Sequence, residues 1–166
     1  MISRGAALGV YDGSLRDCVV ALKYQGRHRT AERLAIRVLA NPRCREVLEA
    51  ADVLVGVPLH ADRVRDRGFN QAELLAVALA RACPVSVSQG LVRTRNTQSQ
   101  TNLSARERRR NVRNAFAVRT DPALRNATVV VVDDVTTTGA TLRECALTLL
   151  AYGAREVRSI TVARAE

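Results

Sequence analysis

The sequence has few aromatic residues, no tryptophan and no long apolar stretch. Aromatic residues make up 3% of the 166 positions, which argues against folds that stack nucleic-acid bases on rows of aromatic side chains. No apolar run approaches the roughly 20 residues that a membrane-spanning helix needs. The first residues lack the basic and apolar regions of a signal peptide. These absences predict a cytoplasmic protein without membrane insertion.

Lysine is almost absent as well, although the chain is strongly basic. Lys23 is the only lysine among 26 basic residues, and the net charge is +10. Between Arg93 and Arg119, eight arginines stand against one acid, Glu107, so this segment carries +7 of that charge. Such a balance favours anionic partners: phosphates, nucleotides, nucleic acid or an anionic membrane surface. A GC-rich genome would explain the choice of arginine over lysine, but not the clustering.

The chain also lacks the paired cysteines of a zinc site or a thioredoxin-like motif. Its four cysteines are far apart, with no CxxC pair, so neither function is indicated. Cys18 and Cys145 fall on the apolar faces of expected helices, where a thiol is a small hydrophobic group. A chain of this length buries about 70% of its unfolded surface without disulfides or metals. We therefore expect one globular domain, residues 1–166, with structural cysteines.

Apolar residues recur in strand-like and helix-like patterns along the chain. Four consecutive valines at 129–132 and the run Asp52–Pro58 are typical of strands buried on both faces. Such strands alternating with helices indicate an α/β fold, a mainly parallel sheet with helices on both faces. The expected strands are 6–11, 52–58, 91–95, 115–119, 128–133 and 156–163, and the expected helices are 15–22, 31–39, 70–82 and 142–150.

The residues that follow the valine run are those most suited to chemistry. Asp133 and Asp134 come directly after it, and a small, threonine-rich loop containing Gly139 then enters a helix. In a parallel sheet, ligands bind beyond the carboxyl ends of the strands. Two carboxylates there accept hydrogen bonds from paired hydroxyls or bind magnesium, and the N–H groups of a helix N-terminus bind phosphate. The pattern predicts a ribose 5-phosphate site.

Two other interpretations of this loop are weaker. Threonines often cap helices, but capping does not explain two adjacent acids after four valines. An acid pair also marks receiver-type phosphoacceptor domains, but there the pair opens the domain, whereas here it stands near the end of the sequence. The chain has no GxxxxGK[ST] sequence, so a nucleoside-triphosphate P-loop is not supported.

At these residues the chain resembles known proteins. VVVVDDVTTTGAT (129–141) resembles the motif of type I phosphoribosyltransferases that binds 5-phosphoribosyl 1-pyrophosphate (PRPP), with Thr136 where most members carry an aliphatic residue. LKYQG (22–26), VPLHADRVRDRGFNQAELLA (57–76) and QSQTNLSARERRRNVRNAF (98–116) are similar to the ComF family, whose members are associated with bacterial competence and DNA uptake. Many ComF-like proteins carry an N-terminal four-cysteine zinc module, which is absent from this sequence.

The resemblance implies a role for each of three segments. In the PRPP loop, Asp133 and Asp134 would be catalytic and would bind the ribose hydroxyls. The whole set of expected PRPP-binding residues is Asp133, Asp134, Val135, Thr136, Thr137, Thr138, Gly139, Ala140 and Thr141. A pyrophosphate loop would comprise Pro58, Leu59, His60, Arg63 and Arg67, with Arg65 between the last two. A flexible hood or DNA contact would comprise Arg93, Gln98, Gln100, Arg106, Arg109 and Arg110.

The resemblance implies two activities. One is transfer of ribose 5-phosphate from PRPP, with Mg²⁺ as cofactor, to an acceptor selected near Ala163–Glu166. The other is a DNA-handling role in which the arginine-rich segment binds single-stranded DNA; the alternative for that segment is a solvated helical face. A regulator that binds PRPP and a partner protein stays open. Competence or helicase proteins and a second copy of the chain are the implied partners. Lys23 and Tyr24 either touch substrate or end a helix.

Overall fold

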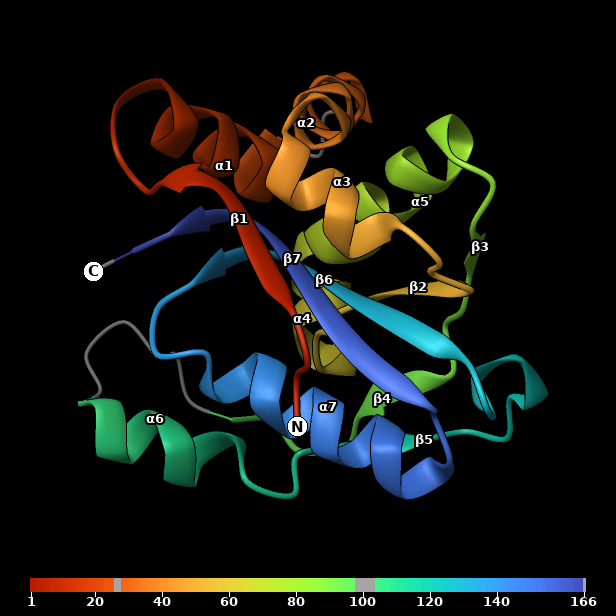
Figure 1. The fold of residues 1–166 in the computed structure, drawn as a ribbon. Helices are drawn as coiled ribbons and strands as arrows, with labels where there is room; N and C mark the ends of the chain where they lie inside the picture. The colour runs from red at the N-terminus through yellow and green to blue at the C-terminus, as the bar shows by residue number, and fades with distance from the viewer. Residues whose placement is uncertain (26–27, 98–103, 166) are drawn as a thin grey trace.

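The structure is a computed structural model, and it describes residues 1–25, 28–97 and 104–165. Five strands form one sheet in the order β1-β7-β6-β2-β3, and every neighbouring pair is parallel. Figure 1 shows this twisted sheet between two layers of helices. These strands are β1 (Gly5–Val10), β2 (Val53–Gly56), β3 (Ser86–Val87), β6 (Thr128–Thr136) and β7 (Glu156–Arg164).

Helices cover both faces of the sheet, as the sequence predicts. One layer lies above the sheet in Figure 1 and the other below it. The upper layer consists of α1 (Gly13–Gln25), α2 (His28–Ala40), α3 (Pro42–Leu48) and α5 (Gln71–Ala82). The lower layer consists of α6 (Ala105–Val112), α7 (Ala140–Tyr152) and a small antiparallel pair, β4 (Leu91–Arg93) and β5 (Phe116–Val118). The short elements α4 (Ala61–Arg67) and η2 (Pro122–Leu124) complete the described chain.

The valine run is the centre of two separate hydrophobic cores. Val130 and Val132 belong to the core under α1, α2, α3 and α5. Val129 and Val131 belong to the core under α7 and the β4–β5 pair. Side chains alternate between the two faces of a strand, so all four valines are almost fully buried. A continuous apolar strand is therefore stable only because both faces are covered.

Two helices differ from the sequence-based expectation. The second expected helix does end at Asn41-Pro42, but α3 begins there, because Asn41 caps the new helix and Pro42 occupies its first turn. Proline is tolerated at that position, where its missing N–H has no helical partner anyway. The segment after His60 was expected to be a loop, but residues 61–67 form α4 with His60 as its N-cap. Helix α4 has no buried residue, so no apolar periodicity revealed it.

The cysteines have the expected structural character. All four are free; Cys44 and Cys145 are buried, and Cys18 and Cys83 are half-buried. Burial raises the pKa of the Cys145 thiol well above its usual value. Among the described residues, no helix is both long and apolar enough to cross a membrane.

Candidate functional site

The two predicted ligand-binding loops meet at one edge of the sheet. Strand β2 pairs in parallel with β6, and the amide of Val57 donates a hydrogen bond of 2.8 Å to the carbonyl of Val132. The segment that follows β2, Pro58–His60, therefore begins beside Asp133 and Asp134. These two acids lie within β6, which continues to Thr136, and not after the strand as the sequence predicts. This juxtaposition follows from the parallel topology, because parallel strands end at the same edge.

The loop into α7 is built to receive an anion. Strand β6 continues through Thr136, and Gly139 then adopts a left-handed conformation with φ +69°. Gly139 is the N-cap of α7 and offers no capping side chain, and no acid lies in the first turn. One threonine hydroxyl, that of Thr138, accepts a hydrogen bond of 3.4 Å from the amide of Ala140.

A small hollow lies at this helix N-terminus. Its volume is about 30 Å³, room for roughly two water-sized positions. The lining residues are Asp133, Val135, Thr136, Thr137, Thr138, Gly139, Ala140, Thr141 and Leu142. Partial positive charge at a helix N-terminus attracts anions, so the hollow is suited to a phosphate group.

The acid pair is held by neighbours from both layers. Asp134 is 4% exposed, and its Oδ2 lies 2.8 Å from the Lys23 Nζ of α1. The amide of Asp134 donates a hydrogen bond of 2.9 Å to Oδ1 of Asp133. Burial, followed by the negative charge of Asp134 and a hydrogen bond between the two side chains, raises the pKa of Asp133 well above its usual value; Lys23 opposes this shift.

Lys23 both ends a helix and contacts the acid pair. It stands in the last turn of α1 and forms the ion pair with Asp134, so it belongs to the site as well as to the helix end. In the sequence, the one feature that distinguishes Lys23 is that it is the only lysine in an arginine-rich chain. The side chain of Tyr24 lies outside the part of the chain that the structure describes.

Two arginines from different elements form the cationic side of the site. One guanidinium NH2 of Arg63, on α4, donates a hydrogen bond of 3.1 Å to the carbonyl of Thr97. Arg93, at the end of β4, donates to the hydroxyl of the same threonine and lies over the ring of Phe116 at 5.4 Å. Burial and then Arg63 lower the pKa of Arg93, whereas Asp133 opposes that change. Arg93 therefore interacts electrostatically with both Arg63 and Asp133.

The guanidinium of Arg93 is incompletely satisfied. Its Nε is buried, and no residue of the described chain forms a hydrogen bond with it. A buried guanidinium donor without a partner is costly, and an anionic ligand at this position would supply the missing acceptor.

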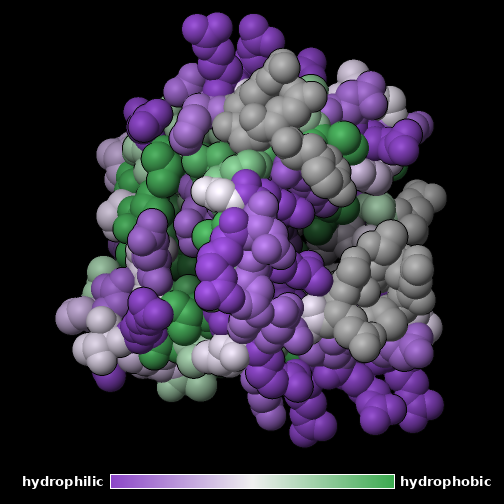
Figure 2. All heavy atoms as spheres, turned by 180° about the vertical axis from the view of Figure 1, so that it is seen from behind, coloured by the Kyte–Doolittle hydropathy of each residue, from purple (hydrophilic) through white to green (hydrophobic). Residues whose placement is uncertain are grey.

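The remaining residues of the predicted pyrophosphate loop have local partners. His60 Nδ1 accepts a hydrogen bond of 3.3 Å from the amide of Asp62, which caps α4. Arg65 pairs with Asp62, and Arg67 donates a hydrogen bond of 2.7 Å to Gln71. The loop itself is thus Pro58–His60, and the arginines assigned to it are carried by α4. Figure 2 shows hydrophilic side chains over the middle of the face where α4 lies.

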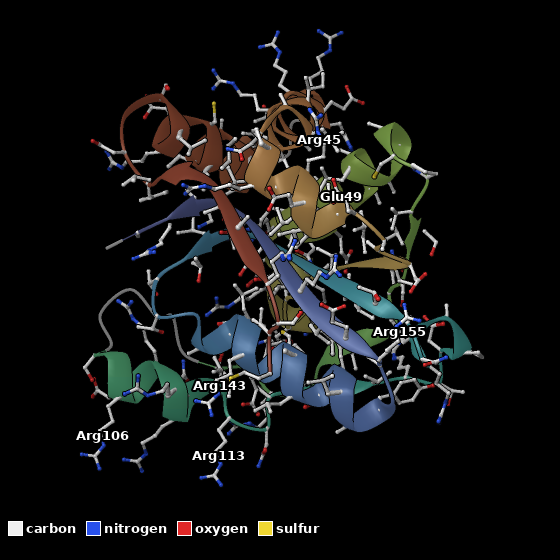
Figure 3. The ribbon with its side chains drawn as sticks, viewed as in Figure 1. Arg45, Glu49, Arg106, Arg113, Arg143 and Arg155 are labelled. Carbon is white, nitrogen blue, oxygen red and sulfur yellow. The ribbon has the colours of Figure 1, made fainter. Side chains whose placement is uncertain are left out.

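The predicted hood residues do not all belong together. Arg93 interacts electrostatically with Asp133, but Arg106, Arg109 and Arg110 are exposed on α6. Figure 3 shows Arg106 and Arg113 pointing away from the sheet. Helix α6 starts at a capping box of Ser104 and Glu107, which also explains the lone acid of the segment. Gln98 and Gln100 lie outside the described residues.

The acid pair does not belong to a larger cluster of metal-ligating side chains in the described part of the chain. In residues 1–25, 28–97 and 104–165, no three His, Cys, Asp or Glu side chains come close enough together to hold a metal ion. The cations that interact with Asp133 or Asp134 are Lys23 and Arg93, and Arg63 interacts with Arg93. The protein side of the site is therefore suited to an anion.

Comparison with known proteins identifies the family. Residues 35–166 match the sequence profile described as the phosphoribosyl transferase domain. The chain belongs to the phosphoribosyl transferase domain family. Within this family it is a ComF-like member, because its relatives carry competence and DNA-utilization names.

Two relatives show how far the similarity extends. The chain is 39% identical over 153 residues to DNA utilization protein YhgH of Escherichia coli strain K12, covering 89% of this chain and 66% of that protein. It is 33% identical over 166 residues to Competence protein F of Haemophilus influenzae, covering 95% of this chain and 71% of that protein. The chain thus spans about two thirds of the length of the YhgH protein that it matches.

A solved structure supports the phosphoribosyl transferase fold. Glutamine PRPP amidotransferase from B. subtilis, complexed with ADP and GMP, superimposes with a TM-score of 0.55 at 23% identity. The match covers 86% of this chain and 30% of the amidotransferase chain. At this level of identity the comparison establishes the α/β fold alone.

Proposed function

We propose that this protein binds PRPP with magnesium and transfers its ribose 5-phosphate to a nitrogen nucleophile, releasing pyrophosphate. One arrangement carries the proposal: the acid pair of β6 leads within one loop to the N-terminus of α7, whose N-cap Gly139 has no side chain, while Arg93, which shares Thr97 with Arg63, interacts electrostatically with Asp133. An anion site, a pair of hydroxyl acceptors and a second anion site correspond to the 5-phosphate, the ribose and the pyrophosphate of PRPP.

Each part of the substrate then has its own binding residues. The N–H groups and threonine hydroxyls of residues 137–141 hold the 5-phosphate, as helix N-termini do. Asp133 and Asp134 accept hydrogen bonds from the ribose hydroxyls. The pyrophosphate lies along Pro58–His60, where Arg63 and Arg93 donate charge-assisted hydrogen bonds, including one from the buried Nε of Arg93.

Magnesium fits this site as a companion of the substrate. The cationic surroundings of the acid pair disfavour a free divalent ion, but they suit a pyrophosphate whose charge is only partly neutralised. When bound, Mg²⁺ stabilises the charge that develops on the leaving pyrophosphate. The phosphate oxygens of the substrate are the ligands available to it, so the ion would be bound through PRPP.

The transfer needs no nucleophile from the protein. The bond between ribose C1 and the pyrophosphate oxygen breaks and leaves its electron pair on pyrophosphate. A bond from C1 to the acceptor nitrogen forms, and the nitrogen loses its proton. The transition state resembles an oxocarbenium ion, so catalysis depends on holding the leaving group and excluding water. The acceptor would lie near the end of β7, where the amide of Ala165 donates to the carbonyl of Thr136 at 2.8 Å.

Calorimetric titration tests this proposal. PRPP with magnesium should bind saturably to the chain, and the heat of binding should disappear when magnesium is removed with a chelator. Incubation with candidate nitrogen acceptors, followed by ³¹P NMR, should then show free pyrophosphate. The absence of PRPP binding to well-folded protein would contradict the proposal and leave the second candidate function below.

DNA handling is that second candidate, and it depends on the arginine-rich segment. The relatives are named for DNA utilization and competence, and α6 presents exposed arginines on a side that points away from the sheet. Their binding to a single strand would be mainly electrostatic, because few aromatic residues are available for stacking. Contacts with helicase or other competence proteins, and pairing into a homodimer, belong to this same proposal.

Replacing Arg106, Arg109 and Arg110 together by glutamine tests the DNA contact. We expect weaker binding of a fluorescent oligo-dT strand. The slope of the logarithm of the binding constant against the logarithm of the salt concentration should become shallower by about 2, because each lost phosphate contact contributes about 0.7. The matched control replaces Arg29, Arg33 and Arg37, which are exposed on α2 on the opposite layer. It removes the same charge. If both triple variants lose affinity equally, α6 is not a specific DNA contact.

A further inference from the structure

One ion pair in the site is unusual for this chain. Twenty-five of the 26 basic residues are arginine, yet the residue that meets the acid pair is the single lysine. Lys23 Nζ lies 2.8 Å from Oδ2 of Asp134, with the lysine side chain 26% exposed and the aspartate side chain 6% exposed. Both side chains of this ion pair, one of which is a predicted ribose acceptor, are largely shielded from solvent.

Lysine and arginine differ in a way that matters at this position. A guanidinium binds a carboxylate with two parallel hydrogen bonds and so occupies both of its oxygens. An ammonium is a compact point charge, and the contact of Lys23 involves one oxygen of Asp134, Oδ2. A lysine can therefore neutralise the buried carboxylate while leaving part of it accessible to a ligand hydroxyl.

The position of Lys23 in α1 supports this role. Lys23 stands in the last turn of the helix, where the partial negative charge of the helix C-terminus favours a cation. Val19 and Leu22 of the same helix are fully buried in the core that also contains Val132. The helix is thus anchored against the sheet, and the reach of the ammonium toward β6 is fixed by packing.

We propose that Lys23 is a positioning residue of the ribose site, which holds Asp134 in one charged orientation by a single contact and leaves it able to accept a ribose hydroxyl. The proposal rests on the PRPP-binding function above. Lys23 also acts on the neighbouring acid. The groups that influence Asp133 are Asp134 on its own strand, Lys23 on α1, Arg93 on β4 and Cys145 on α7.

Three variants separate the charge of Lys23 from its shape. Lys23→Met removes the charge. Lys23→Arg keeps the charge but can form two parallel hydrogen bonds with the carboxylate. Arg16→Met is the control, because it removes an exposed cation from the same helix. We expect PRPP affinity, measured calorimetrically with magnesium, to fall about 30-fold in Lys23→Met and about 10-fold in Lys23→Arg. Arg16→Met should stay within about two-fold of the wild type, because exposed single charges contribute little.

A second readout does not depend on ligand. In ¹³C NMR of the ligand-free protein, the carboxyl of Asp133 should titrate at higher pH in Lys23→Met, because Lys23 opposes the raised pKa of Asp133. Lys23→Arg should restore the wild-type titration although its PRPP affinity stays low. If Lys23 only stabilised the fold, its replacement would lower the melting temperature, but Lys23→Arg would not combine a wild-type Asp133 titration with a low PRPP affinity.

Several outcomes would overturn the inference. If Lys23→Arg binds PRPP as tightly as the wild type, a contact with only one oxygen of Asp134 is not required. This variant remains informative if Lys23→Met does not fold. An Asp133 titration unchanged in Lys23→Met would show that Lys23 does not act on the acids. If the wild type itself fails to bind PRPP, the proposed function is wrong, and the NMR titration then decides separately whether Lys23 controls the acid pair.

Discussion

Replacing Asp134 by asparagine should lower the affinity for PRPP with magnesium by about a hundredfold. Asparagine has nearly the same shape, so the change removes the charge and replaces one acceptor oxygen with a donor. Hydrogen bonds to charged groups contribute about 1.5–3 kcal/mol each, and a hundredfold change corresponds to about 2.7 kcal/mol. The variant also leaves Lys23 without its 2.8 Å partner, which adds a cost in stability.

Binding and stability must therefore be measured separately for Asp134→Asn. Calorimetric titration of PRPP gives the affinity, and thermal unfolding followed by circular dichroism shows that the titrated protein is folded. Asp17→Asn is the matched control, because Asp17 is an exposed acid on α1 and its replacement changes the net charge equally. Affinity within about three-fold of the wild type, equivalent to less than 1 kcal/mol, would mean that Asp134 does not hold the substrate.

The second large effect concerns Gly56, the last residue of β2. A Cβ at this position would lie 2.6 Å from the amide nitrogen of Glu73 and 2.7 Å from the carbonyl carbon of Ala72. Both atoms belong to the backbone of α5, so no side-chain rotation relieves the clash. The helix cannot shift readily, because Ala72 and Leu75 are almost fully buried. Overpacking of this kind costs about 3 kcal/mol.

Gly56→Ala should consequently unfold at a lower temperature, by roughly 10 °C for a chain of this size. Chemical denaturation with urea gives the free energy of unfolding directly. Gly9→Ala is a suitable control, because a Cβ there meets only the terminal δ-methyl of Leu15 at 3.0 Å, and that flexible side chain can move. If the two variants were equally stable, β2 and α5 would not be as closely packed as the structure indicates.

The effect of Gly56→Ala should extend to the site. Gly56 immediately precedes Val57, whose amide binds the carbonyl of Val132 beside the acid pair. A displaced α5 would move Asn70 as well, whose side chain donates to the carbonyl of Val57 at 3.1 Å. The close approach of a helix to a strand thus fixes where the Pro58–His60 loop lies.

Much of this protein could be predicted from short segments of the sequence. The valine run identifies a strand buried on both faces, since only a covered sheet tolerates four consecutive apolar side chains. The acids, small residues and Gly139 that follow it predict the loop into α7, since that chemistry is contained in nine consecutive positions. Both elements are specified by consecutive residues, so they can be recognised without knowledge of the tertiary structure.

Short polar elements were less predictable. Helix α4 buries no side chain, so it lacks the apolar spacing by which helices are recognised. Helix α3 begins at Pro42, and a proline at this position is equally compatible with the end of α2. Only the capping contacts of Asn41 show that a new helix begins there.

The choice among charged residues was decided by the tertiary structure. The sequence groups Arg93 with Arg106 and Arg109, but Arg93 is largely shielded on β4 and interacts electrostatically with Asp133, while α6 carries the other two on an exposed surface. The sequence assigns no partner to Lys23. In the structure Lys23 contacts Asp134, which lies more than a hundred positions later in the chain. Contacts between residues distant in the chain depend on strand order and helix packing, and no local pattern encodes them. The sequence alone therefore determined the sheet and the composition of the loop into α7, whereas the packing of α1 and β4 decided which cations interact with the acid pair.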